Sequence, residues 1–336
     1  MPFTFSHPLF AVPLRRLAPK LSLTGLVLGS MIPDMEYFMA LQSYQTIGHS
    51  FRGFVVQGLP LSIAAAAAFH AVVKPALPGL LPATGGLDRF AASLSSDAWK
   101  LNSARTWLIF LVSLYIGYWT HIFMDAWTHG SGAFVGWFPP LRAEIGGYGV
   151  YKLLQYLFSL IGVAVPGLLL LRRYMRWRGS AGLERLPASA APGTKALLWT
   201  TAAAFGLLLF AAKIVVTGDH NRLVSALIVA PLSSAMFGVF VASLFYRAAR
   251  NRRLAGAFAA VGLLLLAIAS FRISEYVWTP FRLNRPYANF HGDFQSLWNG
   301  YLILWSALVL LGCRMTAAKR RPPSAKHGPE GRTRSA

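Results

Sequence analysis

Three side chains that can bind a metal recur at four-residue steps in the stretch HIFMDAWTH, residues 121–129. They are His121, Asp125 and His129. On an α-helix, positions four apart differ by about 40° around the axis and about 6 Å along it. The three side chains would therefore form one slanted stripe, unless the helix ends before His129. Since imidazole and carboxylate groups together suit zinc, iron or manganese, the spacing predicts part of a metal site.

The stripe also has a structural explanation, which competes with a metal site. A single His or Asp inside a membrane often only makes a hydrogen bond between helices. However, ionisable groups within a membrane are costly and usually mark functional sites. With three such groups on one stripe, we favour a functional site and keep packing as the alternative.

Ligands from one helix rarely complete a metal site, so further ligands must come from other segments. The segment GSMIPDMEYF offers Asp34 and Glu36, and the segment TIGHSFRG offers His49. Asp34 could instead cap a following helix, and His49 alone would be read as an interfacial histidine. Cys313 is the only cysteine, which excludes an intramolecular disulfide and a cysteine-rich metal site. Together with the stripe, Asp34 and His49 favour a shared metal.

The elements that must position these residues are predicted to be membrane helices. Apolar residues make up 55% of the 336 residues and charged residues 13%. About 20 apolar residues in a row suffice to cross a bilayer as a helix. The candidate spans are 53–73, 106–127, 151–171, 195–217, 223–246, 254–271 and 295–313. We expect an all-α, multi-pass helical membrane protein with about seven transmembrane helices.

Basic residues crowd three connections and predict the orientation of the chain. These are residues 172–195, residues 247–253 and the tail from Arg314. Each lies two spans from the next, so all three fall on one side, and positive charge marks the cytoplasmic side. We therefore assign the net charge of +21 to membrane topology rather than to nucleic-acid binding. Membrane lipids are the expected partners, and the C-terminus is expected in the cytoplasm.

The same orientation places the candidate ligands at the outer face. Asp34, His49 and the stripe all fall there, and His7 joins them if the N-terminus is outside. The apolar run 21–33 is too short for a straight crossing, so it could re-enter the membrane or lie in the interface. The side of the N-terminus therefore stays open.

The order of these motifs resembles a known family. An early histidine in MPFTFSHP is followed by GSMIPDMEYF, GHS, GYWTHIFMDAWTH and VYKLLQYLFS. This order resembles the bacterial membrane proteins catalogued as domain of unknown function 4184, closely over residues 1–175 and loosely beyond. That family in turn resembles the inner-membrane metal-dependent hydrolases of the YdjM type and, more distantly, zinc-dependent phospholipases C.

The resemblance implies a metal set, and most of its members were already candidates. Carried over to this sequence, it consists of His7, Asp34, Glu36, His49, His121 and Asp125, while His129 is peculiar to the narrower family. Glu36 stands where the broader pattern has Asp, and GHS supplies one histidine where that pattern often has two. These departures leave open whether one metal or two bind and whether the site catalyses.

The resulting expectation is a membrane-bound metal-dependent hydrolase at the outer face of the bacterial inner membrane. Its substrate would be an amphiphilic phosphoester or a similar lipid, and zinc is the first choice of metal, with manganese or iron as alternatives. Glu36 is our choice for the base that takes a proton from water. Arg52 and Arg142 could hold an anionic head group, although each alone is better explained as an interfacial anchor. The alternative is a non-catalytic carrier or assembly factor that uses the stripe for packing or ion passage.

We expect four regions along the chain. They are a motif-bearing membrane domain with the metal site at 1–175, a basic cytoplasmic loop at 176–194, a four-helix membrane region at 195–313 and a disordered basic tail at 314–336. The second half carries less chemistry. Its His291 and Asp293 form a weak ligand pair that hydrogen bonding within a loop explains better.

Overall fold

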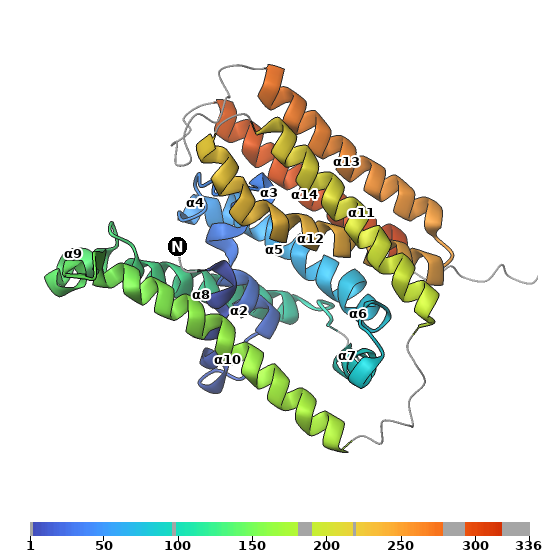
Figure 1. Ribbon diagram of the computed structural model, residues 1–336, viewed down its shortest axis with the longest axis horizontal. Helices are drawn as coiled ribbons and strands as arrows, with labels where there is room; N and C mark the ends of the chain where they lie inside the picture. Colours follow the sequence, from blue (N-terminus) through green and yellow to red (C-terminus); the bar gives the residue numbers. More distant parts are fainter. Residues whose placement is uncertain (1–2, 96–98, 181–189, 218–219, 278–292, 318–336) are drawn as a thin grey trace, which may run out of the picture.

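The protein consists almost entirely of helices (Figure 1). The computed structural model describes residues 3–95, 99–180, 190–217, 220–277 and 293–317. Within these residues the strands form one small antiparallel hairpin, β1 (Glu144–Ile145) and β2 (Tyr148–Gly149). Its two turn residues, Gly146 and Gly147, have φ of 60° and 80°, as a tight hairpin turn with positive φ at both central positions requires.

Seven helical segments of the described chain are long and apolar enough to cross a membrane. They are Phe51–Leu80, Ala104–Trp137, Val150–Ser180, Pro192–Val216, Leu223–Arg250, Leu254–Ser274 and Gln295–Thr316. Each overlaps one of the spans predicted from the sequence. The prediction of an all-α multi-pass membrane protein is therefore confirmed.

Several of these spans are composed of more than one element. The first joins α4 (Phe51–Gly53), the π-helix η4 (Phe54–Gly58), α5 (Leu59–Ala67), the π-helix η5 (Ala68–Val73) and α6 (Lys74–Leu80). The second joins α8 (Ala104–Thr128) and α9 (Ala133–Trp137). The others lie in α10 (Val150–Ser180), α11 (Pro192–Val216), α12 (His220–Arg250), α13 (Leu254–Val277) and α14 (Asp293–Ala317). Shorter elements connect them: η6 (Thr84–Gly86), α7 (Leu87–Ser95) and η7 (Pro139–Arg142).

A series of short helices precedes the first span. They are η1 (Thr4–Ser6), α1 (Pro8–Ala11), η2 (Val12–Arg16), α2 (Leu23–Gly29), η3 (Ile32–Asp34) and α3 (Met35–Ala40). Because α2 has seven residues, it is only about 10 Å long and does not cross a bilayer. It packs closely on α8, since a Cβ added at Gly29 would collide with the Leu114 carbonyl. The apolar run 21–33 thus buries itself against the second span.

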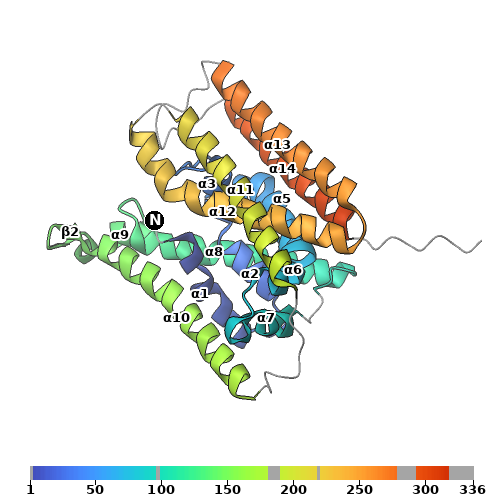
Figure 2. The ribbon, with the colours of Figure 1, turned by 45° about the vertical axis from the view of Figure 1, so that its right-hand side comes forward.

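The helices form two groups that meet along the first span. In both views α8 and α10 lie with α2 on one side, and α11 to α14 lie on the other, with α5 and α6 between them and α3 beside α12 (Figures 1 and 2). A shared core joins the groups, because Tyr44 and Phe54 cluster with Trp298 and Leu302 of α14. This arrangement brings the N-terminal motifs next to both α8 and α14.

Candidate metal centre

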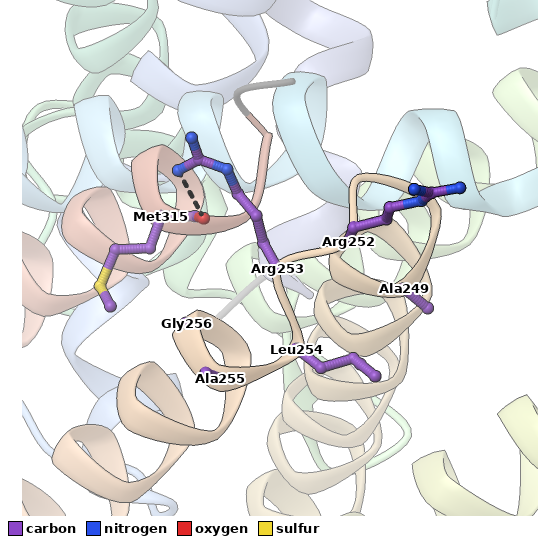
Figure 3. Close-up of a pocket in the computed structure, with 7 residues that line it drawn as sticks. All are labelled: Ala249, Arg252, Arg253, Leu254, Ala255, Gly256 and Met315. Carbon is purple, nitrogen blue, oxygen red and sulfur yellow. Dashed lines mark hydrogen bonds between the residues drawn. The ribbon is translucent and has the colours of Figure 1, made fainter. Parts of the chain in front are cut away.

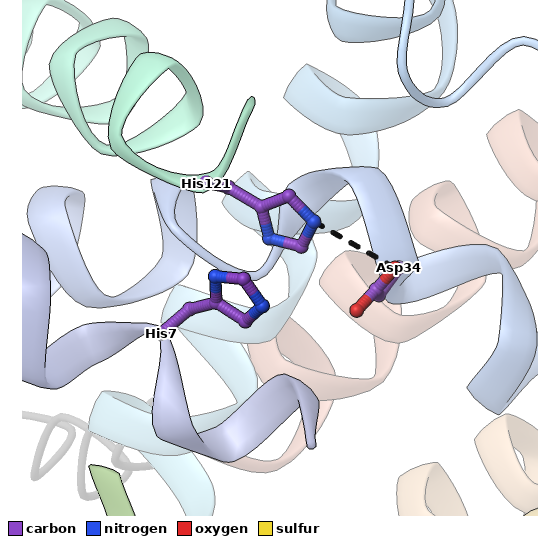
Figure 4. Close-up of side chains that lie close together, drawn as sticks. All are labelled: His7, Asp34 and His121. Carbon is purple, nitrogen blue, oxygen red and sulfur yellow. Dashed lines mark ion pairs between the residues drawn. The ribbon is translucent and has the colours of Figure 1, made fainter. Parts of the chain in front are cut away.

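Five predicted ligands from four separate segments meet at one place. His7 caps η1, Asp34 ends η3, His49 precedes α4, and His121 and Asp125 lie on α8. Figure 4 shows His7, Asp34 and His121 with their side chains pointing toward one another. We refer to these five side chains as the His/Asp cluster.

The distances within the cluster fit a shared metal ion. The Nε2 atom of His121 lies 3.2 Å from Asp125 Oδ2 and 3.8 Å from Asp34 Oδ1. The Nε2 atom of His49 lies 3.4 Å and 3.9 Å from the same two oxygens, and His7 Nε2 lies 3.8 Å from Asp125 Oδ1. Ligand atoms at about 2.1 Å from one zinc ion are at most about 4.2 Å apart. Two overlapping groups of three, one of His7, Asp34 and His121 and one of His49, His121 and Asp125, each have ligand atoms within 4.8 Å of one another, close to the separations that one shared ion requires.

Several buried atoms of the cluster have no hydrogen-bond partner in the described chain. They are His7 Nδ1 and Nε2, Asp34 Oδ1, His121 Nε2 and Asp125 Oδ1. A buried polar atom without a partner costs about 1–3 kcal/mol. The other oxygen of Asp34 accepts a hydrogen bond of 2.8 Å from Thr4 Oγ1, which directs Oδ1 toward the histidines. The cluster is thus an unsatisfied set of metal-binding atoms.

The ring of His121 is oriented for binding through Nε2. Its Nδ1 lies 2.8 Å from the Ser30 carbonyl oxygen, which can only accept a hydrogen bond. Nδ1 therefore carries a hydrogen, and Nε2 is the ring atom that faces the two carboxylates. A cation at Nε2, either a proton or a metal ion, would satisfy these atoms.

Contacts with α10 and stacking hold His7 in place. Its ring stacks on His121, with centroids 3.8 Å apart and planes inclined by 14°. A Cβ added at Gly162 of α10 would collide with Ser6, so this glycine allows η1 to lie directly on α10. Burial lowers the pKa of His7 well below its usual value, and neighbouring His121 lowers it further. His7 is therefore neutral at pH 7, the form that binds metals.

Comparison with known families identifies the chain at this point. Residues 1–248 match the family model described as Domain of unknown function (DUF4184). The protein belongs to this family. The match includes the whole His/Asp cluster and the first five spans, while α13 and α14 lie beyond it. Comparisons with curated proteins and with solved structures gave no match.

His129 lies at the rim of the cluster of this DUF4184 protein. It caps the C-terminus of α8, which ends at Thr128, so the predicted stripe reaches it only at the helix end. Its Nδ1 is 3.6 Å from Asp125 Oδ1 and 3.0 Å from the Asp125 carbonyl oxygen. Its side chain is 29% exposed, more than any of the five side chains of the His/Asp cluster, of which His49 is the most exposed at 23%. Its role as a ligand remains a prediction.

Glu36 faces a different group of residues from Asp34. Its Oε1 accepts hydrogen bonds from the backbone of Thr46 (2.8 Å) and Gly48 (3.2 Å). Its Oε2 accepts from Thr46 Oγ1 (2.6 Å) and Trp298 Nε1 (3.1 Å). Positions two apart on a helix point about 200° apart, which explains why Asp34 and Glu36 diverge. With each oxygen already accepting two hydrogen bonds, these contacts do not support the base role predicted for Glu36.

The remaining candidates from the sequence lie outside the cluster. Arg52 and Arg142 are exposed, and none of the contacts that the structure shows joins either of them to the cluster. His291 falls outside the described residues, and Asp293 is described only as the first residue of α14.

Sequence reasoning did not predict the residues that support the ligands. Gln45 Nε2 lies 2.6 Å from His49 Nδ1, and Thr4 and Ser30 hold Asp34 and His121. A signal was available only for Gln45, a polar side chain four residues before the ligand that it contacts. Thr4 and the Ser30 carbonyl support ligands that are 30 and 91 positions away, so no comparable signal for them existed in the sequence.

One pocket lies away from the His/Asp cluster. A pocket of about 780 Å³ is formed where α12, α13 and α14 meet (Figure 3). It is lined by Ala249, Arg252, Arg253, Leu254, Ala255, Gly256 and Met315. Its arginines, Arg252 and Arg253, belong to the basic connection 247–253 that we predict to be cytoplasmic, and none of the lining residues belongs to the His/Asp cluster.

Proposed function

We propose that this DUF4184 protein is a membrane-embedded metal-dependent hydrolase. The metal is held by His7, Asp34, His49, His121 and Asp125. One observation supports this above all: three imidazoles and two carboxylates converge, and buried atoms of His7, Asp34, His121 and Asp125 have no hydrogen-bond partner among the described residues. Their ion-pair partners in the described chain are one another and His129, with no lysine or arginine among them.

Zinc is the first choice of metal, with manganese or iron as alternatives, since the ligands are nitrogen and oxygen atoms. When bound, such a metal would polarise a phosphoryl or acyl oxygen and lower the pKa of a bound water. The chain's own residues orient the site: Ser30 fixes the His121 ring and Thr4 fixes Asp34. His129, exposed beside Asp125, is the side chain that we propose to exchange protons with solvent.

The substrate that fits this position is amphiphilic and anionic, such as a phospholipid or a lipid-linked phosphate. The cluster opens to the surface on one side, where His49 is 23% exposed and Asp125 12% exposed. Exposed Arg52 and Arg142 would contact the head group. The resemblance of the motifs to those of YdjM-type hydrolases favours the same class of reaction.

We place the site at the outer face of a bacterial inner membrane. The cluster lies near the C-terminal end of α8, whereas the basic residues Arg247 and Arg250 lie at the C-terminal end of α12. Positive charge marks the cytoplasmic side, so the C-terminal end of α12 is cytoplasmic. The chain crosses the membrane twice more, in α13 and α14, and its C-terminus is therefore cytoplasmic as well. A reporter fused after Arg334 that is active only outside the cytoplasm would overturn this orientation.

The activity is tested with purified protein, phospholipid vesicles and a chromogenic phosphocholine ester. We expect the zinc-loaded wild type to release a phosphorylated product, and we expect release to stop after chelation and in His121→Ala. The matched control is His70→Ala, because His70 bonds to Thr24 and stacks on Trp99 instead of joining the cluster. Zinc-loaded wild type that hydrolyses neither substrate would contradict the proposal. A stable wild type that binds no metal would favour the carrier or assembly factor.

A further inference from the structure

A buried polar network surrounds Glu36 and does not include the His/Asp cluster. Glu36 is 1% exposed and accepts four hydrogen bonds. Three of them come from the segment Thr46–Gly48, which has no regular helix or strand. The fourth comes from Trp298 of α14. A carboxylate that accepts this many bonds is a structural anchor for the groups that donate them.

The network continues through Thr46 to two amides. Thr46 Oγ1 donates to Glu36 and accepts hydrogen bonds from Gln57 Nε2 (2.9 Å) and Gln295 Nε2 (3.3 Å). This uses its one donor and both acceptor positions. Asn299 Oδ1 in turn accepts from Gln57 and Gln295, at 2.9 Å each. The first turns of α14 are thereby bonded to the segment that precedes His49.

The position of His49 depends on this segment. The other cluster residues lie in helices or directly at their ends, whereas His49 follows Gly48 in a turn. A Cβ added at Gly48 would lie 2.6 Å from the Pro33 carbonyl oxygen and 2.8 Å from Glu36 Oε1. The backbone next to His49 therefore lies directly against Glu36 and the segment that carries Asp34.

We infer that Glu36 is a positioning residue that holds His49 toward the His/Asp cluster, and that α14 contributes to the site through it. This inference rests on the proposed metal-binding function. It extends the functional unit beyond the matched residues 1–248, because Gln295, Trp298 and Asn299 all lie in α14. Residues that support a metal ligand typically change metal affinity by about 10–100-fold when replaced.

The first experiment measures zinc affinity by competition with a chelator for wild type, Glu36→Gln and Thr46→Val. We expect both variants to bind zinc 10–100-fold more weakly. Asp88→Asn is the matched control for Glu36, since Asp88 is a fully buried carboxylate bonded to Lys195 at 2.8 Å. Thr316→Val is the control for Thr46, because Thr316 is buried near the other end of α14. Both controls should keep wild-type affinity even where they lower thermal stability.

A double-mutant cycle with His49→Ala distinguishes a positioning role from direct binding. If Glu36 acts through His49, Glu36→Gln should have no further effect on affinity once His49 is removed. An equal loss in both backgrounds would mean that Glu36 acts directly on the metal, and it would overturn the inference. Unchanged affinity in Glu36→Gln and Thr46→Val, with only lower stability, would overturn it as well.

A readout without metal separates this inference from the proposed function. Amide hydrogen exchange of residues 45–50 in metal-free protein should speed up in Glu36→Gln and Thr46→Val but not in the two controls. Wild type that binds no zinc would contradict the proposed function, and the exchange rates would still test how His49 is held. Unchanged exchange in both variants would overturn the positioning role.

Discussion

Two buried polar groups lie side by side in this membrane protein, and they differ in how their atoms are satisfied. In the network around Glu36, both carboxylate oxygens, the Thr46 hydroxyl and the Trp298 ring nitrogen all have hydrogen-bond partners. The Gln57 carbonyl oxygen is an exception among its described atoms. In the His/Asp cluster, buried atoms of His7, Asp34, His121 and Asp125 lack hydrogen-bond partners within the part of the chain that the structure describes.

The difference assigns a separate task to each group. Burying polar atoms is costly unless they are bonded, and the network around Glu36 meets that requirement within the chain except at the Gln57 side-chain carbonyl. The cluster does not meet this requirement, although contacts with Ser30 and Thr4 and the stacking of His7 on His121 fix the positions of its residues. A fixed set of unsatisfied ligand atoms favours the binding of a metal ion, whereas a satisfied network stabilises one geometry of the chain. The predictions below follow this contrast from the largest expected effect to the smallest.

Adding zinc should stabilise the protein, because it satisfies only the cluster. At a free zinc concentration of about 1,000 times Kd, binding contributes about 4 kcal/mol to the stability of the folded state. Thermal unfolding in detergent should therefore shift upward with zinc for wild type and for Thr316→Val. No shift is expected for His121→Ala. If zinc did not change the unfolding temperature of the wild type, the polar atoms of the cluster would be satisfied without zinc.

Asp125→Asn should weaken zinc binding about 100-fold or more. Replacing a residue that only supports a metal ligand typically weakens binding about 10–100-fold, and replacing the ligand itself should cost more. Asp125 lies next to all four histidines of the region, namely His7, His49, His121 and His129. The change keeps the shape of the side chain and removes its charge. Competition with a chelator measures the loss, and Asp88→Asn provides the control. Equal affinity in Asp125→Asn and wild type would remove the central residue from the site.

Gly48→Ala should destabilise the protein by about 1–3 kcal/mol, the usual cost of forcing an extra group into a packed region. The new Cβ would press on the Pro33 carbonyl and on Glu36, so it should also displace His49 and weaken zinc binding. Gly136→Ala in α9 is the control, because a Cβ there meets nothing within 4 Å. Denaturant unfolding and zinc titration give both quantities. If Gly48→Ala behaved like Gly136→Ala, the segment would be less tightly held than the network implies.

His129→Ala should have the smallest effect on binding. His129 is 29% exposed and contacts only Asp125 among the cluster residues in the described chain. We expect zinc affinity to fall less than tenfold, with a larger effect on the rate of hydrolysis because we assign it proton exchange. Parallel measurements of affinity and rate test this division. A loss of affinity as large as that of Asp125→Asn would make His129 a full ligand.

Much of the fold and the cluster could be predicted from the sequence. Apolar segments near the length of a bilayer crossing locate the spans, and all seven appear in the structure. The four-residue spacing of His121 and Asp125 placed them on one face of a helix, as observed. Asp34 and His49 could be chosen because they are predicted to lie on the same side of the membrane as the stripe.

The partners of Glu36 could not be predicted in the same way. Trp298 lies 262 positions away, and Gln295 and Asn299, although four residues apart on α14, carry amides that do not point to a particular partner. Only the packing of α14 on the first span brings them together. The direction of the Glu36 side chain could have been predicted, since side chains two positions apart on a helix point about 200° apart. A side chain two residues after Asp34 points away from whatever Asp34 faces.

The central claim, that the His/Asp cluster binds a metal, is tested most directly by the metal content of purified protein. Wild type, His121→Ala and His70→Ala would be purified without chelators, incubated with zinc, desalted and analysed for metal per chain. The account predicts about one zinc ion in wild type and in His70→Ala, and none in His121→Ala. A folded wild type without metal, or equal zinc in wild type and His121→Ala, would contradict it.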